Sequence, residues 1–383
     1  MHSSTSSSRD VAGGAPFGFV LGGRSARSGI IALLTGLVLI FLTLEVTSPL
    51  VLAHFSHTEQ RVDRELQEAA SLRAVTADGR PTILLAGNSL LKEGVLIPSL
   101  HDDLATQYEV RRLVIEQTHY LDWYFGLRRL LEEGSRPGIV VLTLATAQLA
   151  SPLTLGQSFA HRQMSFRDFP RAVRESRLDR TTASTYLFAH WSRWLGNEGF
   201  IRQCVSISVF PGFRQLAGRI ADHGAHIHDP STLLNMAQQR QPELRDLSQQ
   251  FGVPVVLLIP PNLNQDSSRE SQELGNQIGV PVWILSPAGE FPRDYFSDGF
   301  HLNRRGAEIY TTRLSRQVRS MNMGQVARHF VHEPPNGKPA DVQATLQDGS
   351  QRESADAERK QPHAHAARGN PGPRSRTSIN TVR

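Results

Sequence analysis

The stretch PTILLAGNSLL, residues 81–91, decides the fold of this chain. Its first half is a continuous apolar run, typical of a strand buried on both faces, and it leads into Gly87-Asn88-Ser89-Leu90. In open α/β sheets, the groups that act on ligands collect at the carboxyl ends of the strands. The stretch therefore predicts a first strand that delivers Ser89 to this edge. Taken alone, Gly-Asn-Ser is also an ordinary turn, because Gly and Asn suit turns.

Strands and helices alternate on both sides of this stretch. The pattern predicts an α/β domain with a doubly wound, mainly parallel sheet flanked by helices. A mostly helical insertion, at about 150–250, interrupts the alternation and is itself broken at Pro211-Gly212 and near Asp229-Pro230. The other expected strands are 109–117, 139–145, 253–261 and 280–285, and the expected helices are 96–106, 121–133 and 304–320.

A second motif lies near the end of this pattern, in YFSDGFHLNRRGAEIY, residues 295–310. Asp298 precedes His301 by three residues on a Gly-containing loop, directly before an amphipathic helix that Asn303 is expected to cap. A carboxylate at this spacing can accept the imidazole Nδ1–H and leave Nε2 free as a general base. An Asp-x-x-His segment alone is also an ordinary capped loop. Together with Ser89 at another strand-to-helix transition, it predicts a serine-type site.

With GNSL at one end and DGFH at the other, residues 80–320 resemble the SGNH/GDSL hydrolase family. The first block of that family reads Gly-Asp-Ser-Leu, and its last block is Asp-x-x-His followed by a helix. The resemblance implies an SGNH-like fold with Ser89 as nucleophile, His301 as base and Asp298 as the acid that orients His301. Asn88 departs from the family pattern, because an aspartate commonly precedes the serine.

The two middle blocks of the family are not plainly present. The family usually supplies a Gly after the second strand and an Asn after the third, and both donate hydrogen bonds to the oxyanion with the serine's own N–H. Here Thr118 follows the second expected strand, and Thr146 and Gln148 follow the third. Their hydroxyl or amide groups could donate instead, or they could be ordinary loop residues. Asn262, after the fourth strand, could orient substrate or simply form a Pro-Pro-Asn turn.

An uncharged stretch, GIIALLTGLVLIFLTL, occupies residues 29–44, and apolar character resumes after Glu45 as far as Ala53. A membrane-spanning helix needs about 20 mostly apolar residues, so we expect an uncleaved, single-pass anchor at 29–53. Arg24 and Arg27 precede it, which predicts a cytoplasmic N-terminus and an extracytoplasmic main domain, periplasmic in a Gram-negative bacterium. Signal-peptidase cleavage near Ala53 and a buried core helix are the alternatives.

The chain divides into five expected parts. We expect a disordered cytoplasmic N-terminus and a disordered tail because their compositions cannot support a core. Alternating charge at 57–75 predicts a solvated stalk helix that lifts the domain off the bilayer. The parts are residues 1–28, the anchor at 29–53, the stalk at 54–79, the α/β domain at 80–330 and the tail at 331–383.

Charge and cysteine content exclude some classes of partner and cross-link. The net charge is +5, but 41 Lys and Arg are scattered among 36 Asp and Glu, so no nucleic-acid partner is expected. Cys204 is the single cysteine, which excludes an intrachain disulfide.

Two further clusters lie in the insertion. His223, His226 and His228 could bind Zn²⁺, but they lack a helix-borne HExxH spacing and are typical of a solvated loop, so we expect no metal and no cofactor. Phe188, Trp191 and Trp194 have helical spacing, which predicts that they pack an insertion helix into the core. Stacking on a sugar is the alternative for the tryptophans.

The sequence therefore predicts a membrane-anchored, extracytoplasmic SGNH-like serine esterase or O-acyltransferase. The expected substrate is an acyl ester, in particular an acetyl ester, of an envelope or exported polysaccharide, or another acylated small molecule. This substrate rests on the family resemblance and on location. The alternative is a non-catalytic scaffold that works with envelope-assembly proteins, which the missing oxyanion blocks favour. The lipid bilayer, through the N-terminal helix, is the expected partner in both cases.

Overall fold

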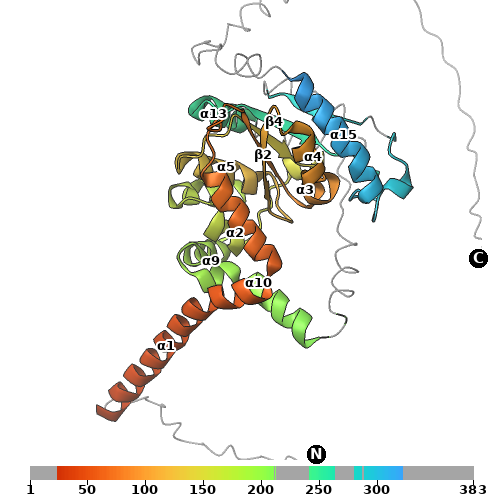
Figure 1. The fold of residues 1–383 in the computed structure, drawn as a ribbon. Coiled ribbons are helices and arrows are strands. Elements are labelled where there is room, and N and C mark those ends of the chain that lie inside the picture. The colour runs from red at the N-terminus through yellow and green to blue at the C-terminus, as the bar shows by residue number, and fades with distance from the viewer. Residues whose placement is uncertain (1–23, 211, 213–240, 264–279, 287–288, 322–383) are drawn as a thin grey trace, which may run out of the picture. The chain divides into compact units, whose positions relative to one another are not determined.

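The computed structural model describes residues 24–210, 212, 241–263, 280–286 and 289–321. Within these residues, one parallel sheet has the strand order β2-β1-β3-β4-β5 (Figure 1). The strands are β1 (Thr82–Gly87), β2 (Glu109–Val114), β3 (Ile139–Thr143), β4 (Val255–Ile259) and β5 (Val282–Ile284). The predicted doubly wound α/β fold with a parallel sheet is confirmed.

Helices cover both faces of the sheet because side chains alternate along each strand. Ile83 and Leu85 of β1 belong to one buried cluster, while Leu84 and Ala86 belong to the other. The first cluster includes side chains of α3 (Ser89–Gly94), α4 (Ile97–Leu104) and α15 (Arg304–Ser320). The second includes side chains of α2 (His57–Ala70), α5 (Tyr120–Glu132) and α13 (Gln241–Phe251). Burial on both faces explains the uninterrupted apolar run of β1.

The end of β1 lies very close to β3. A Cβ atom added to Gly87 would lie 2.9 Å from the Thr143 carbonyl oxygen and 3.0 Å from the Leu91 Cβ. Only glycine fits this approach without movement of the neighbouring backbone. Gly87 thereby sets the position from which the chain turns into Ser89.

The N-terminal helix α1 (Arg24–Phe55) contains a 28-residue stretch, Arg27–His54, that is long and apolar enough to cross a membrane. By length and composition it could be a membrane anchor or a signal sequence. The helix begins at Arg24, so residues 24–28 are helical and are not part of a disordered segment. Residues 1–23 and the predicted disordered tail from residue 331 lie outside the described residues.

The prediction of a solvated stalk helix is wrong. α2 packs on the sheet: Val62 and Ala69 are buried in the core. Glu65 accepts a hydrogen bond from the backbone N–H of Val114, 2.8 Å away, and pairs with Arg112 at 2.6 Å. β2 is an edge strand of the sheet, so α2 covers the exposed side of β2, and the charged side chains of α2 pair with those of the strand. The alternating charge that resembled solvation therefore belongs to an interface within the domain.

The predicted helical insertion is present where it can be described. It comprises α6 (Thr146–Ala150), α7 (Gln157–Arg162), α8 (Phe169–Glu175), α9 (Arg180–Trp191) and α10 (Arg193–Val209). The part from 213 to 240, with His223, His226 and His228, lies outside the described residues.

The prediction that the aromatic residues of the insertion pack into the core is wrong for two of them. Phe188 and Trp191 are exposed, whereas Trp194 is partly buried. Tyr186 and Ala189 are the residues of α9 that face inward. Phe188 and Trp191 lie on the outer face of α9, whereas Trp194 belongs to α10, which begins at Arg193.

Candidate active site

Ser89 is the first residue of α3, and Asn88 fixes its position. The fully buried Asn88 side chain accepts a hydrogen bond from Leu90 N–H at 3.0 Å, which caps the helix, and donates one to the Thr118 carbonyl oxygen at 2.9 Å. An aspartate could provide the cap but could not donate to a carbonyl oxygen. The asparagine therefore ties the turn after β1 to the turn after β2.

The loop before α15 holds Asp298 and His301 in a defined arrangement. Asp298 Oδ1 accepts hydrogen bonds from Phe300 N–H at 2.9 Å and His301 N–H at 2.7 Å. Gly299 has a φ of +85°, a conformation that a side chain would strain. Asn303 caps α15 by accepting from Gly306 N–H at 3.1 Å, as expected. Short-range bonds therefore fix the loop in the conformation that its sequence favours.

The structure brings Ser89, His301 and Asp298 together. His301 Nδ1 lies 2.7 Å from Asp298 Oδ2, and His301 Nε2 lies 2.9 Å from Ser89 Oγ. Ser89 and His301 are partly buried and Asp298 is exposed. The carboxylate can accept the Nδ1–H, which leaves Nε2 as the acceptor of the serine proton. This is the geometry of a nucleophile, a base and an orienting acid.

The ionisation of Asp298 fits this arrangement. Partial burial acts to raise the pKa of Asp298, but hydrogen bonds from the His301 N–H, the His301 imidazole and the Phe300 N–H outweigh it and hold the pKa below its usual value. Asp298 therefore stays an anion, the form that accepts the Nδ1–H and stabilises a protonated imidazole.

Two of the residues proposed as oxyanion donors have other roles. The buried Thr118 hydroxyl donates to the Ile115 carbonyl oxygen at 2.6 Å and accepts from Trp123 Nε1 at 2.9 Å. Its single proton is committed, so the prediction that Thr118 donates to an oxyanion is wrong. Gln148 Oε1 accepts from Ala145 N–H at 3.0 Å and closes the first turn of α6.

The other two candidates lie at the predicted edge of the sheet. Thr146 is the buried first residue of α6, directly after β3. Asn262 is partly buried after β4. Both follow the carboxyl ends of strands that share this edge with β1.

Gln117 is a residue that sequence reasoning missed. Its φ of 62° lies in the left-handed region, which is uncommon for a residue other than Gly. Its turn is held beside Ser89 at both ends: Ile115 N–H donates to the Gly87 carbonyl oxygen at 3.0 Å, and Asn88 binds Thr118. Among the described residues, no acceptor receives the backbone N–H of Gln117. A glutamine gives no sign in the sequence of this backbone conformation.

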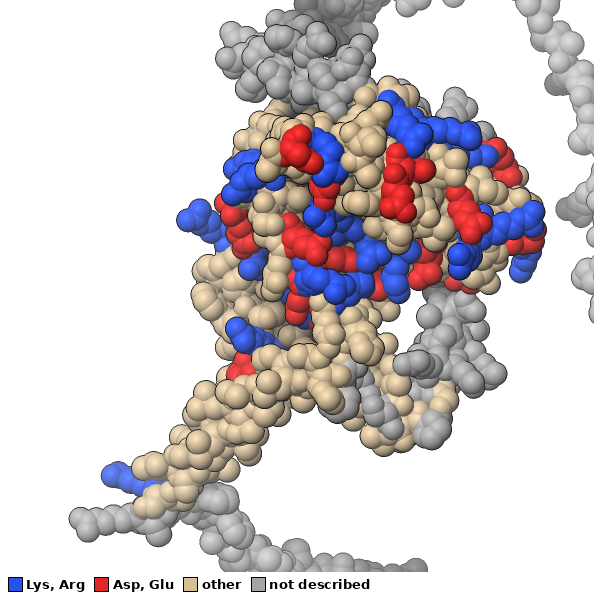
Figure 2. All heavy atoms as spheres, in the orientation of Figure 1, with Lys and Arg blue, Asp and Glu red and all other residues tan. Residues whose placement is uncertain are grey.

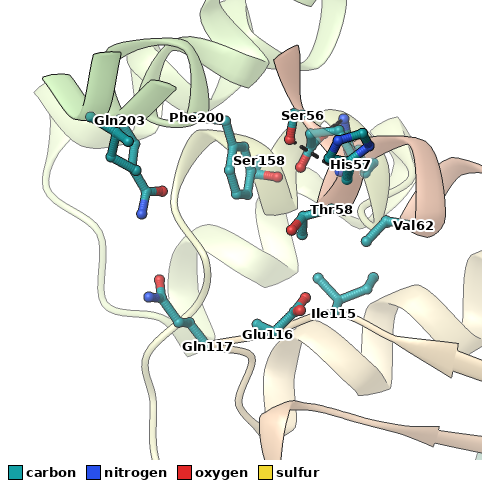
Figure 3. A pocket seen from close by; sticks show the side chains of 13 residues that line it. Ser56, His57, Thr58, Val62, Ile115, Glu116, Gln117, Ser158, Phe200 and Gln203 are labelled. Carbon is teal, nitrogen blue, oxygen red and sulfur yellow. Dashed lines mark hydrogen bonds and ion pairs between the residues drawn. The ribbon is translucent and has the colours of Figure 1, made fainter. Parts of the chain in front are cut away.

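A cavity of about 460 Å³ lies beside the same turn (Figure 3). The turn after β2 forms one wall, and α10 contributes Phe200 and Gln203 to the wall opposite. Glu116, in the first wall, pairs with Lys92 of α3 at 3.3 Å. The described lining includes neither Ser89 nor His301. The cavity is therefore next to the Ser89 turn, one strand away along the edge of the sheet.

No metal site is found within the described ranges, because no three His, Cys, Asp or Glu residues there are grouped to hold an ion.

A buried carboxylate organises the start of α5 near this edge. Asp122 is fully buried and accepts hydrogen bonds from His119 N–H and Leu155 N–H, both at 2.8 Å. Burial raises the pKa of Asp122 to about 7, despite these two hydrogen bonds, which lower it. The folded protein therefore binds this proton more tightly than the unfolded chain, where an Asp has a pKa of about 3.9.

This raised pKa predicts a dependence of stability on pH. The free energy of unfolding should fall by up to a few kcal/mol as pH rises from about 4 to about 7, because the folded state loses the proton that it binds more tightly. In Asp122→Asn this contribution should be missing, so the fall should be smaller. Urea unfolding of both proteins at pH 4.5, 6 and 8 measures it. Equal pH slopes for the two proteins would contradict the assignment.

Comparison with known proteins finds a likeness to solved structures. No family model and no curated protein matches the chain. A solved structure described as the crystal structure of TesA matches with 14% sequence identity and a TM-score of 0.32, covering 62% of this chain and 97% of that one. At this TM-score the likeness carries no weight in assigning a function, so the interpretation of the site rests on its own geometry.

Proposed function

We propose that this chain is a membrane-anchored serine esterase or O-acyltransferase that uses Ser89, His301 and Asp298. The proposal rests on two hydrogen bonds of His301, one to Asp298 at 2.7 Å and one to Ser89 at 2.9 Å. The three residues come from opposite ends of the α/β domain, in the chain order serine, aspartate, histidine. That order and the GNSL and DGFH motifs are similar to the SGNH/GDSL pattern.

The geometry supports a two-step acyl transfer. Ser89 Oγ attacks the ester carbonyl while His301 Nε2 takes its proton, and the protonated imidazole then gives that proton to the leaving alkoxide. This leaves an acyl group on Ser89. Water or a sugar hydroxyl attacks the acyl-enzyme with His301 again as base, which makes the reaction a hydrolysis or a transfer. Asp298 holds the imidazole orientation and stabilises its positive charge.

Backbone groups are the proposed oxyanion donors. The Ser89 N–H lies at the start of α3, and the Gln117 N–H lies in the adjoining turn without an acceptor among the described residues. A donor of this kind is worth about 2.7–4 kcal/mol in the barrier. Gln117 thus takes the place proposed above for Thr118, and it does so through its backbone rather than its side chain.

A backbone role for Gln117 predicts that its side chain is dispensable. Gln117→Ala and Gln117→Gly should both keep ester turnover, because both keep the N–H. Gln117→Gly should also raise the free energy of unfolding by about 1 kcal/mol, since glycine adopts a positive φ without strain. Turnover and urea unfolding of the pair measure these effects. Loss of turnover in both variants would assign the chemistry to the side-chain amide instead.

The proposed substrate is an acyl ester, in particular an acetyl ester, of an envelope or exported polysaccharide. This rests on the family resemblance and on the proposed location of the domain outside the cytoplasm, with α1 as anchor. A non-catalytic scaffold that joins envelope-assembly proteins is the second candidate. The hydrogen bonds of the Thr118 hydroxyl within the protein favour this scaffold, because they remove one predicted oxyanion donor.

Ester turnover by the full-length protein in detergent or nanodiscs distinguishes the two candidates. p-Nitrophenyl acetate tests the serine chemistry, and acetate release from an acetylated glycan tests the substrate. We expect turnover of both. Turnover of the aryl ester alone would keep the serine mechanism and reject the glycan, whereas no turnover of any ester would favour the scaffold.

A further inference from the structure

Large apolar side chains are exposed on the helical insertion. We call them the α9–α10 face, and they are Phe166, Phe188, Trp191, Val205, Val209 and Phe210, with exposed fractions from 51% to 70%. Phe166 and Trp191 are in contact, with ring centroids 5.6 Å apart. Exposed apolar groups of this size commonly mark a surface that binds a partner or a membrane.

This face is joined to α1 through Glu45. The Glu45 carboxylate accepts hydrogen bonds from the Ser192 hydroxyl, from Arg193 N–H at 2.9 Å and from Trp194 N–H at 3.3 Å. These donors form the N-terminus of α10, where backbone N–H groups and the helix dipole favour an anion. The one acid of the apolar helix is thus paired, and α10 begins at the level of Glu45.

The length of α1 places this level at the surface of a bilayer. The uncharged residues 29–44 are 16 residues long, which at about 1.5 Å each gives roughly 24 Å. A hydrocarbon core is about 30 Å thick, so this run alone is too short and Glu45 falls near its boundary. Side chains attached at that level meet the boundary between headgroups and acyl chains, where Trp and other aromatic residues are favoured.

The packing of α10 and the distribution of charge also fit a position of α10 at the membrane surface. α10 packs against α1, and Figure 1 shows it leading away from that helix. On the face that Figure 2 shows, the Lys, Arg, Asp and Glu side chains gather over the α/β domain, with few around α10 and the adjoining part of α1. Arg180, Arg193 and Arg202 are exposed on α9 and α10, and they suit anionic headgroups.

We propose that the α9–α10 face is a second membrane contact, which lies in the interfacial region of the bilayer that α1 crosses. Its partner is the lipid itself. The opposite side of α10 carries Phe200, Gln203 and Ile207, which line the cavity beside the Ser89 turn. The contact therefore holds the cavity and the carboxyl edge of the sheet close to the membrane surface. The proposal does not depend on catalysis by Ser89.

Depth-dependent quenching of a fluorophore on the full-length protein tests this contact. In a Cys204→Ser background, Trp191→Cys and Phe210→Cys would carry a nitrobenzoxadiazole label in vesicles of phosphatidylcholine and phosphatidylglycerol. Leu37→Cys on α1 reports the hydrocarbon core, and Thr312→Cys on α15 reports water. We expect labels at 191 and 210 to be quenched by lipids with a shallow spin label, to be protected from iodide and to emit at shorter wavelength than the label at 312.

Iodide quenching at 191 and 210 equal to that at 312, with Leu37 lipid-exposed, would overturn the second contact while leaving α1 as an anchor. It would place the face in water. A Leu37 label that iodide reaches would overturn the membrane arrangement as a whole. Lipid quenching at 191 but not at 210 would overturn the orientation of α10 along the surface.

Discussion

Ser89→Ala and His301→Ala should each lower ester turnover by on the order of 10⁴-fold or more, and the double variant should lose little further activity. The two residues act in one step, so removal of either the nucleophile or its base removes the same reaction. The 2.9 Å contact between His301 Nε2 and Ser89 Oγ is the physical reason. Catalytic efficiency on p-nitrophenyl acetate measures the effect.

Asp298→Asn should retain more activity than the other two variants, because Asp298 orients the imidazole without touching the substrate. A control is Ser297→Ala, which removes a hydrogen bond to the His301 carbonyl oxygen, at 3.1 Å, but leaves the three side chains in place, so it should lower turnover far less than Ser89→Ala. Turnover that survives in Ser89→Ala would contradict the serine mechanism.

Asn88→Asp should destabilise the protein by about 3 kcal/mol or more and reduce turnover, although aspartate is the residue commonly found before the serine in the family it resembles. The new carboxylate would be fully buried and would face the Thr118 carbonyl oxygen, to which Asn88 now donates at 2.9 Å. The turn that holds Ser89 beside Gln117 would lose this connection. Urea unfolding and catalytic efficiency measure the two effects.

Asn303→Asp is the matched control for this change. Asn303 also caps a helix through its side-chain oxygen and donates to a carbonyl oxygen, that of Asp294, at 2.6 Å, but it is only partly buried, so an aspartate there stays solvated. Asn303→Asp should lower the free energy of unfolding much less than Asn88→Asp. Equal losses of unfolding free energy at the two positions would contradict the large penalty expected for a buried carboxylate at residue 88.

Local sequence was enough to predict the sheet and the main contacts of the site. Strands buried on both faces must be apolar along their whole length, so β1, β3 and β4 were recognisable. The loop from Asp298 to His301 is held by hydrogen bonds within a few residues, so its spacing indicated that Asp298 could bind His301. Parallel strands end at one edge, which is why a serine and a histidine 212 residues apart could be expected to meet there.

Features that depend on tertiary contacts were not predictable in this way. The alternating charge pattern of α2 looks the same in the sequence whether the charged side chains face water or the edge strand. Only their partner residues on β2 show that they face the strand. Helical spacing of Phe188 and Trp191 defines a face but not whether that face points inward. The left-handed backbone of Gln117 depends on the turns that Asn88 joins, and a glutamine carries no local preference for it.

Labelling by a fluorophosphonate tests the central claim most directly, because this probe reacts with a serine whose proton is taken by a base. The full-length protein would be labelled in detergent and the modified residue identified by peptide mass spectrometry, with His301→Ala treated in parallel. We predict labelling at Ser89 in the wild type and a large loss of labelling rate in His301→Ala. An unlabelled Ser89 in the wild type, or the same rate in both proteins, would contradict an activated serine at this site.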